Sequence, residues 1–136
     1  MSKGQVASPE THTAGPNETL SFEETTLQLP VLPSTGDSEE DALSFSIQRL
    51  TLGGVSFLGF PAEMFVQYAL DYRTRNSASV FLLGNTNGCL GYFATAEEYH
   101  RGGYEIEEAH QYYGKPKFGP DSEPLVREAI HSLLLV

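Results

Sequence analysis

The chain has 136 residues, of which 40% are hydrophobic and 19% charged, and its formal net charge is −10. This length fits one domain and argues against a multidomain enzyme, since domains cluster near roughly 100 to 150 residues. The acidity argues against nucleic acid or an anionic membrane surface as partner, because binding either of them needs a basic stripe that the sequence lacks. No apolar run approaches the roughly 18 residues of a membrane span, so we expect neither a span nor an export signal within this chain.

The first third of the sequence is polar and acidic. Residues 1–44 hold eight carboxylates against Lys3, a charge of −7, while residues 45–136 hold ten carboxylates against seven basic residues, a charge of −3. We expect residues 1–21 to form a disordered tail, because few of their side chains suit burial and ordering costs about 1 to 2 kcal/mol per residue. Residues 22–44 are expected to contain a Thr-rich strand followed by an acidic surface loop.

Residues 45–136 predict an α/β segment with a small mixed sheet. Alternating residues over 45–52 and an apolar run over 55–60, separated by a Gly-Gly pair, predict a β-hairpin. An amphipathic helix over about 62–75 and a short apolar strand over 79–84 follow, and together with the preceding strand they predict a βαβ unit with parallel strands. We expect the strand over 79–84 to be buried on both faces, with one helix covering each face of the sheet.

Two further helices are predicted in the last third of the sequence. Thr95 and Glu98 match a capping box, which predicts a short helix over about 96–101. Ser122 is in a position to cap a longer helix over about 123–135, whose apolar residues recur on one side.

Polar side chains follow the two predicted parallel strands at the point where each strand ends. Glu63 follows the first strand, and a loop with Asn85, Asn87 and Tyr92 follows the second. The carboxyl ends of neighbouring parallel strands share one edge of a sheet, which is where α/β proteins bind ligands. A carboxylate beside such a loop suits an oxygen-ligand site. Spacing alone favours a simpler interpretation, in which Glu63 complements a helix dipole and Tyr92 belongs to the core.

Four short segments point to a known family when they are taken together. They are Gly-Phe-Pro-Ala-Glu-Met-Phe at 59–65, Gly-Asn-Thr-Asn-Gly-Cys-Leu-Gly-Tyr-Phe-Ala-Thr at 84–95, Glu-Glu-Tyr at 97–99 and Gly-Gly-Tyr-Glu at 102–105. In order and spacing they resemble the neutral/alkaline non-lysosomal ceramidase family, over roughly residues 45–134. The resemblance implies the carboxyl-terminal part of a catalytic domain, with Glu63 and Tyr92 as zinc ligands. It also implies hydrolysis of an N-acyl amide, as in ceramide, by a zinc-activated water.

The resemblance also implies ligands that this chain does not supply. Members of the family provide two histidine ligands from far upstream, and His12, His100, His110 and His131 match no such position, so we expect them to be surface or partly packed residues. Cys89 has no matching catalytic histidine, so a thiol nucleophile is not expected. We therefore expect no catalytic residue in this chain, and a missing upstream segment or partner chain that completes the site. The completed site would act on a lipid amide. The compartment stays open, although family members are often exported.

A second hypothesis belongs to a different class of protein. In it the chain is a noncatalytic α/β interaction module derived from the same fold. This hypothesis predicts that the chain folds cooperatively as a stable monomer, whereas the first predicts zinc binding through Glu63 and Tyr92 once upstream sequence is supplied.

Overall fold

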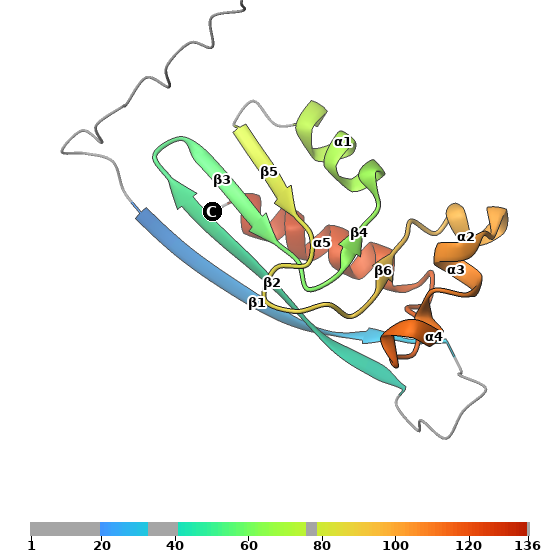
Figure 1. Ribbon diagram of the computed structural model, residues 1–136. Coiled ribbons are helices and arrows are strands. Elements are labelled where there is room, and N and C mark those ends of the chain that lie inside the picture. The colour runs from blue at the N-terminus through green and yellow to red at the C-terminus, as the bar shows by residue number, and fades with distance from the viewer. Residues whose placement is uncertain (1–19, 33–40, 76–78, 136) are drawn as a thin grey trace, which may run out of the picture.

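The computed structural model describes residues 20–32, 41–75 and 79–135 and has a mixed α/β architecture (Figure 1). The strands are β1 (Leu20–Pro30), β2 (Ala42–Leu52), β3 (Val55–Gly59), β4 (Glu63–Met64), β5 (Ser79–Leu83) and β6 (Tyr92–Phe93). The helices are α1 (Val66–Arg75), α2 (Glu98–Arg101), α3 (Tyr104–Glu107), α4 (His110–Tyr113) and α5 (Ser122–Leu134). Most of the predicted tail and most of the predicted acidic loop lie outside the described residues. No helix within these ranges is long and apolar enough to cross a membrane.

The main sheet has the strand order β1-β2-β3-β5. β2 and β3 form the predicted antiparallel hairpin, and β3 and β5 are parallel with α1 between them in the chain, so the predicted βαβ unit is confirmed. β1 and β2 pair without interruption from Leu20 opposite Leu52 to Pro30 opposite Ala42. Both strands therefore begin before the predicted positions, and in β2 the buried Leu43 continues the alternation of Phe45 and Ile47.

The core lies on one face of the sheet, beneath α1 and α5. Side chains alternate between the two faces of a strand. Those of β1, β2 and β3 that face the helices are buried at Leu29, Leu43, Phe45, Ile47, Ser56 and Leu58, and half-buried at Glu23, Thr25, Leu27, Arg49 and Thr51. They meet the buried face of α5 and aromatic residues from the loops. The fully or nearly fully enclosed side chains include Leu29, Phe45, Ile47, Leu58, Phe60, Tyr68, Phe93, Phe118, Val126 and Ile130. The rings of Phe45, Phe93 and Phe118 form a mutually contacting group with centroid distances of 5.1 to 5.6 Å.

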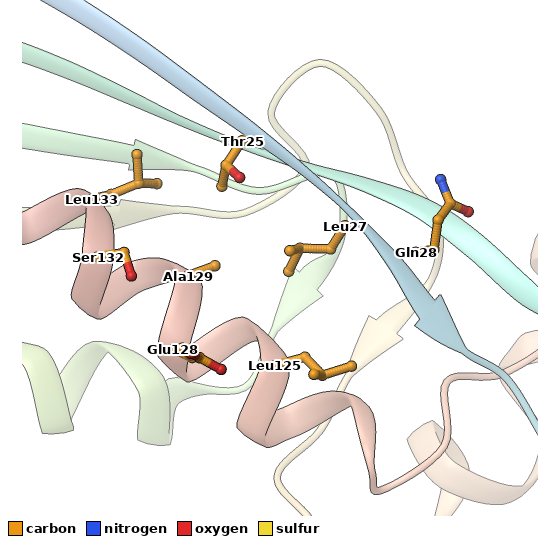
Figure 2. Close-up of a pocket in the computed structure, with 8 residues that line it drawn as sticks. All are labelled: Thr25, Leu27, Gln28, Leu125, Glu128, Ala129, Ser132 and Leu133. Carbon is orange, nitrogen blue, oxygen red and sulfur yellow. The ribbon is translucent and has the colours of Figure 1, made fainter.

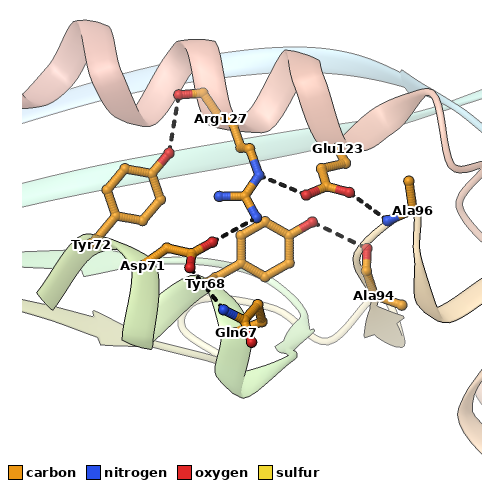
Figure 3. A network of polar contacts seen from close by, with 8 residues as sticks. All are labelled: Gln67, Tyr68, Asp71, Tyr72, Ala94, Ala96, Glu123 and Arg127. Carbon is orange, nitrogen blue, oxygen red and sulfur yellow. Dashed lines mark hydrogen bonds and ion pairs between the residues drawn. The ribbon is translucent and has the colours of Figure 1, made fainter. Parts of the chain in front are cut away.

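The other face of the sheet is open among the described residues. α1 and α5 lie on the same face and contact each other (Figure 3), so the prediction of one helix on each face is wrong. β5 is an edge strand in which Val80 and Leu82 pack toward the core, while Phe81 is 52% exposed and Leu83 43%. The prediction that this strand is buried on both faces is therefore also wrong. Alternate residues of its continuous apolar run face the core and the open face of the sheet.

A polar network joins α1 to α5 (Figure 3). The Arg127 guanidinium of α5 lies 3.0 Å from the Asp71 carboxylate of α1 and 2.6 Å from the Glu123 carboxylate, and it stacks 4.7 Å from the centre of the Tyr68 ring. The Tyr68 hydroxyl donates to the Ala94 carbonyl at 3.1 Å, and Glu123 accepts a hydrogen bond from the Ala96 amide. The network therefore fixes the segment that follows β6 as well as the two helices.

The two predicted helix caps do not form. The Glu98 carboxylate pairs with Arg101 at 2.5 Å, and its amide bonds to the backbone carbonyl of Thr95. α2 accordingly begins at Glu98, two residues after the predicted start. The Ser122 hydroxyl donates to the Pro30 carbonyl at 2.8 Å, so this buried serine anchors α5 to the end of β1.

Candidate functional site

Two loops that leave the ends of β3 and β5 run side by side and build the candidate site. Their backbones are joined by hydrogen bonds of 2.8 to 3.1 Å, which are Phe60 N to Leu83 O, Asn85 N to Ala62 O, Thr86 N to Phe60 O, Leu90 N to Pro61 O, Glu63 N to Gly91 O and Phe65 N to Phe93 O. This pairing produces a second, two-stranded sheet in which β4 and β6 are parallel and Glu63 lies opposite Tyr92. The structure thus brings together the two residues singled out from the sequence.

The composition of the second loop follows from its backbone path. Asn85 and Asn87 have φ values of 51° and 59°, in the left-handed region that asparagine tolerates better than most residues. A Cβ at Gly84 would lie 3.0 Å from the Ala62 carbonyl oxygen, and one at Gly88 would lie 3.1 Å from the Pro61 ring. The Asn- and Gly-rich sequence therefore permits both the tight path and the close approach to the first loop.

Glu63 does not lie in the first turn of a helix. The predicted helix over 62–75 begins at Val66 and has no acidic residue in its first turn, because residues 60–65 use their backbone groups to pair with the neighbouring loop. The interpretation of Glu63 as a residue that complements a helix dipole is therefore wrong. Its side chain is half-buried at the end of the small sheet, beside the half-buried Tyr92.

A third side chain reaches the site from α4. The Tyr113 hydroxyl donates a hydrogen bond to Oε1 of Glu63. The Tyr113 ring packs edge-on against Tyr92, with centroids 6.0 Å apart and an interplanar angle of 88°, and Phe65 and Tyr104 pack on Tyr92 at 6.3 and 6.5 Å. The Glu63 carboxylate and the Tyr92 phenol are therefore held within an aromatic surround that restricts their movement.

The Glu63 carboxylate affects the protonation of both tyrosines. Burial, together with the negative charge of Glu63, raises the pKa of Tyr92 above its ordinary value near 10. The hydrogen bond to Glu63 is the largest cause that raises the pKa of Tyr113, followed by burial and by the Glu63 charge. Both phenols are therefore neutral at physiological pH in the protein without a bound cation, and Tyr113 acts as a donor.

The donor set fits one half of a zinc site. Carboxylate and other hard oxygen donors are acceptable zinc ligands, and Glu63 and Tyr92 present two of them side by side. Within the described residues no three side chains of His, Cys, Asp or Glu come together. His100 and His131 are exposed, and His12 lies outside the described residues. His110 is half-buried on α4 with an enclosed Nδ1 that has no hydrogen-bond partner among the described atoms.

Tyr113 was not anticipated from the sequence as part of the site. It belongs to a Tyr-Tyr pair in which Tyr112 is 77% exposed, and nothing in the spacing distinguishes the two. Only the tertiary placement of α4 against β4 separates their roles. Cys89 lies exposed in the loop between β5 and β6.

A separate groove of about 440 Å³ runs between β1 and α5 (Figure 2). Its lining is mostly apolar, and Glu128 is its one ionisable side chain among Thr25, Leu27, Gln28, Leu125, Glu128, Ala129, Ser132 and Leu133. A single carboxylate gives this groove no second group for acid, base or metal chemistry. The pair at Glu63 and Tyr92 is therefore the stronger candidate for a reactive site.

No protein-family model, curated protein or solved structure matches this chain.

Proposed function

We propose that this chain is part of a zinc-dependent amidohydrolase of the neutral/alkaline ceramidase-like type. In this proposal Glu63 and Tyr92 supply two of the zinc ligands. The observation that supports it is the parallel pairing of β4 with β6, which sets the Glu63 carboxylate beside the Tyr92 phenol at the carboxyl-terminal side of two parallel strands. The sequence spacing of Glu63 and Tyr92 does not by itself require these side chains to lie together, and each of the sequence motifs covers only a short segment. Their pairing therefore supports the proposal independently of the motifs.

The residues of this chain would hold and orient the metal. Zinc, when bound, lowers the pKa of a coordinated water toward about 7 and polarises the amide carbonyl. Tyr113 donates to Oε1 of Glu63 and so fixes the orientation of that carboxylate, as hydrogen-bond donors outside the first coordination shell commonly do at metal sites. The aromatic surround of Tyr92 keeps its oxygen in a defined position.

The remaining ligands would come from polypeptide beyond the described residues. Two imidazoles from an upstream segment or a partner chain would complete a four-ligand zinc shell, and the substrate class would then be an N-acyl amide of a lipid, such as a sphingolipid amide. The chain alone is expected to be inactive, because half of a zinc shell leaves the metal weakly held.

Zinc titration of a completed protein tests the proposal. The chain is extended with its genomic upstream sequence, provided that this sequence is in frame and bears histidines, and zinc affinity is measured by calorimetry at neutral pH. We expect Glu63→Gln with Tyr92→Phe to weaken zinc binding by at least 100-fold. Tyr113→Phe is expected to weaken it by 10- to 100-fold, the range typical of outer-shell partners.

A matched pair of changes serves as the control. Glu128→Gln with Tyr112→Phe alters the same two residue types at exposed positions, and it is expected to leave zinc affinity unchanged. Equal affinity for the Glu63/Tyr92 variant and this control would show that the two residues bind no zinc.

The alternative function is a noncatalytic α/β interaction module. The observation that favours it is the core beneath α1 and α5, in which the described residues enclose large side chains such as Phe45, Phe60 and Tyr68. A chain of this kind melts cooperatively and binds zinc no more tightly than its Glu63/Tyr92 variant. Calorimetric melting combined with the titration above distinguishes the two functions.

A further inference from the structure

The open face of the main sheet is apolar at one end and polar at the other. The register of the four strands sets its side chains in rows that cross the sheet. One row is Phe22, Leu50, Phe57 and Phe81, which is apolar across all four strands, and the Phe57 and Phe81 rings stack at 5.5 Å. The adjoining row at the end of the sheet holds Leu20, Leu52 and Val55, and it ends at Ser79 on β5.

This apolar end, which we call the outer patch, is strongly exposed. It consists of Leu20, Phe22, Leu50, Leu52, Val55, Phe57, Phe81 and Leu83. Six of these side chains are exposed, at 68, 60, 40, 52, 52 and 43% for Leu20, Phe22, Leu50, Leu52, Phe81 and Leu83 respectively. None of the eight is charged, although the chain has a net charge of −10. Farther along the same face the side chains are polar, from Glu24 and Gln48 to Gln28 and Ser44.

The outer patch has both a hollow and protruding side chains. A hollow of about 400 Å³ is lined by Phe22, Leu50, Phe57 and Leu83, with Gln48, Gly59, Thr86 and Asn87 along its other side. Gly59 carries no side chain, and Thr86 packs over it, since a Cβ at Gly59 would lie 2.8 Å from Cγ2 of Thr86. Leu20, Leu52 and Phe81 belong to the same patch but do not line it. A surface with a recess and adjacent protrusions is suited to contact a copy of itself across a two-fold axis.

The area of the outer patch is near that of a dimer interface. Six large apolar side chains, each about half exposed, present on the order of 600 Å², and Val55 and Phe57 add to this. A monomeric protein rarely exposes a larger contiguous apolar patch, and a stable interface buries roughly 800 Å² on each partner. The segment of residues 1–19, which joins the patch at Leu20, has few apolar side chains with which to cover it, namely Met1, Val6, Ala7 and Ala14.

We propose that the outer patch is a self-association surface on which a second copy of this chain packs, sheet face against sheet face, about a two-fold axis. In such an interface the sheets lie about 10 Å apart and their inward side chains interdigitate. A protruding side chain of one copy, such as Phe81, fills the hollow of the other. Glu24 lies at the border of the outer patch, in the cross-strand row that ends at Leu83, so its carboxylate stays in water at the rim of the interface.

Sedimentation equilibrium of the full chain tests this proposal over a concentration series. We expect a monomer–dimer equilibrium in which Phe22→Lys with Phe81→Lys raises the dissociation constant at least 100-fold, because each copy would then bring charges into the interface at both ends of the apolar row. Val66→Lys changes a side chain that is 70% exposed on α1, outside the patch, and is expected to leave the equilibrium unchanged.

A milder variant guards against a folding defect. Leu50→Thr retains a residue that favours strands, and it is expected to weaken the dimer about tenfold while the far-ultraviolet circular dichroism stays the same. A chain that is monomeric at all concentrations up to about 1 mM would overturn the proposal, as would open-ended aggregates. A dimer that tolerates the Phe22/Phe81 substitutions would place the interface elsewhere and would also overturn it.

Discussion

Arg127→Met removes the cation at the centre of the network between α1 and α5, and we expect it to lower the free energy of unfolding by about 2 to 3 kcal/mol. The Arg127, Asp71 and Glu123 side chains are only 27, 22 and 15% exposed. Breaking a fully buried ion pair by removing one partner costs about 3 to 5 kcal/mol, and the remaining exposure to water reduces that value here. Methionine keeps the helix propensity and most of the aliphatic stem, so the loss isolates the charge and the stacking on Tyr68.

Arg101→Met is the matched control for this prediction. Arg101 also bridges two carboxylates on a helix, Glu97 and Glu98, but it is 61% exposed, so we expect a loss below about 0.5 kcal/mol. The assay is urea unfolding followed by circular dichroism, supported by thermal melting, in which Arg127→Met should lower the melting temperature by roughly 10 °C. Equal losses for the two variants would refute the reasoning that burial, and not the number of ion pairs, determines the contribution.

Two further predictions concern alkaline stability and core packing. Burial, assisted by the Glu123 charge, raises the pKa of Tyr99 to about 12. The stability that its protonated form contributes is therefore complete below pH 10 and is lost as pH rises toward 12. Across this range the free energy of unfolding of Tyr99→Phe should decline less steeply than that of the unaltered protein, while that of the exposed Tyr112→Phe should decline as the unaltered protein does. Leu58→Ala removes a fully enclosed side chain and should lower the free energy of unfolding by about 2 to 5 kcal/mol. Leu125→Ala, at a position that is 41% exposed, should lower it by less than about 0.5 kcal/mol. Similar losses at the two leucines would contradict the enclosure of Leu58 in the core.

The elements predicted correctly from the sequence are those whose apolar pattern is decided locally. The hairpin around Gly53 and the parallel strands on either side of α1 follow from alternation and from the Gly-Gly turn. The burial of β5 was predicted wrongly, because a run of apolar residues is compatible with two buried faces and equally with one buried face and one exposed apolar face. Which of these two cases applies depends on the position of α5, and the pattern of apolar residues along the sequence does not reveal that position.

The candidate site shows the same division between local and tertiary information. The pairing of Glu63 with Tyr92 was anticipated, because both residues follow neighbouring parallel strands. The start of α1 was predicted too early, since the hydrogen bonds that hold residues 60–65 in an extended path come from a loop about 25 residues away in the chain. The contact of Tyr113 with Glu63 joins residues 50 positions apart, and no local pattern marks it.

The backbone bonding between the two loops has a consequence for how the Glu63 and Tyr92 oxygens would meet a ligand. Because main-chain groups set their separation, the pair is preorganised, and binding there needs little further loss of chain entropy. An exposed side chain of the intervening loop, such as Cys89, is then free to vary without moving the pair, whereas the Thr86 hydroxyl donates to the Leu83 carbonyl at 3.0 Å and helps to hold the loop. A homologous chain could therefore change the residues that surround the site while keeping the distance between the Glu63 and Tyr92 oxygens.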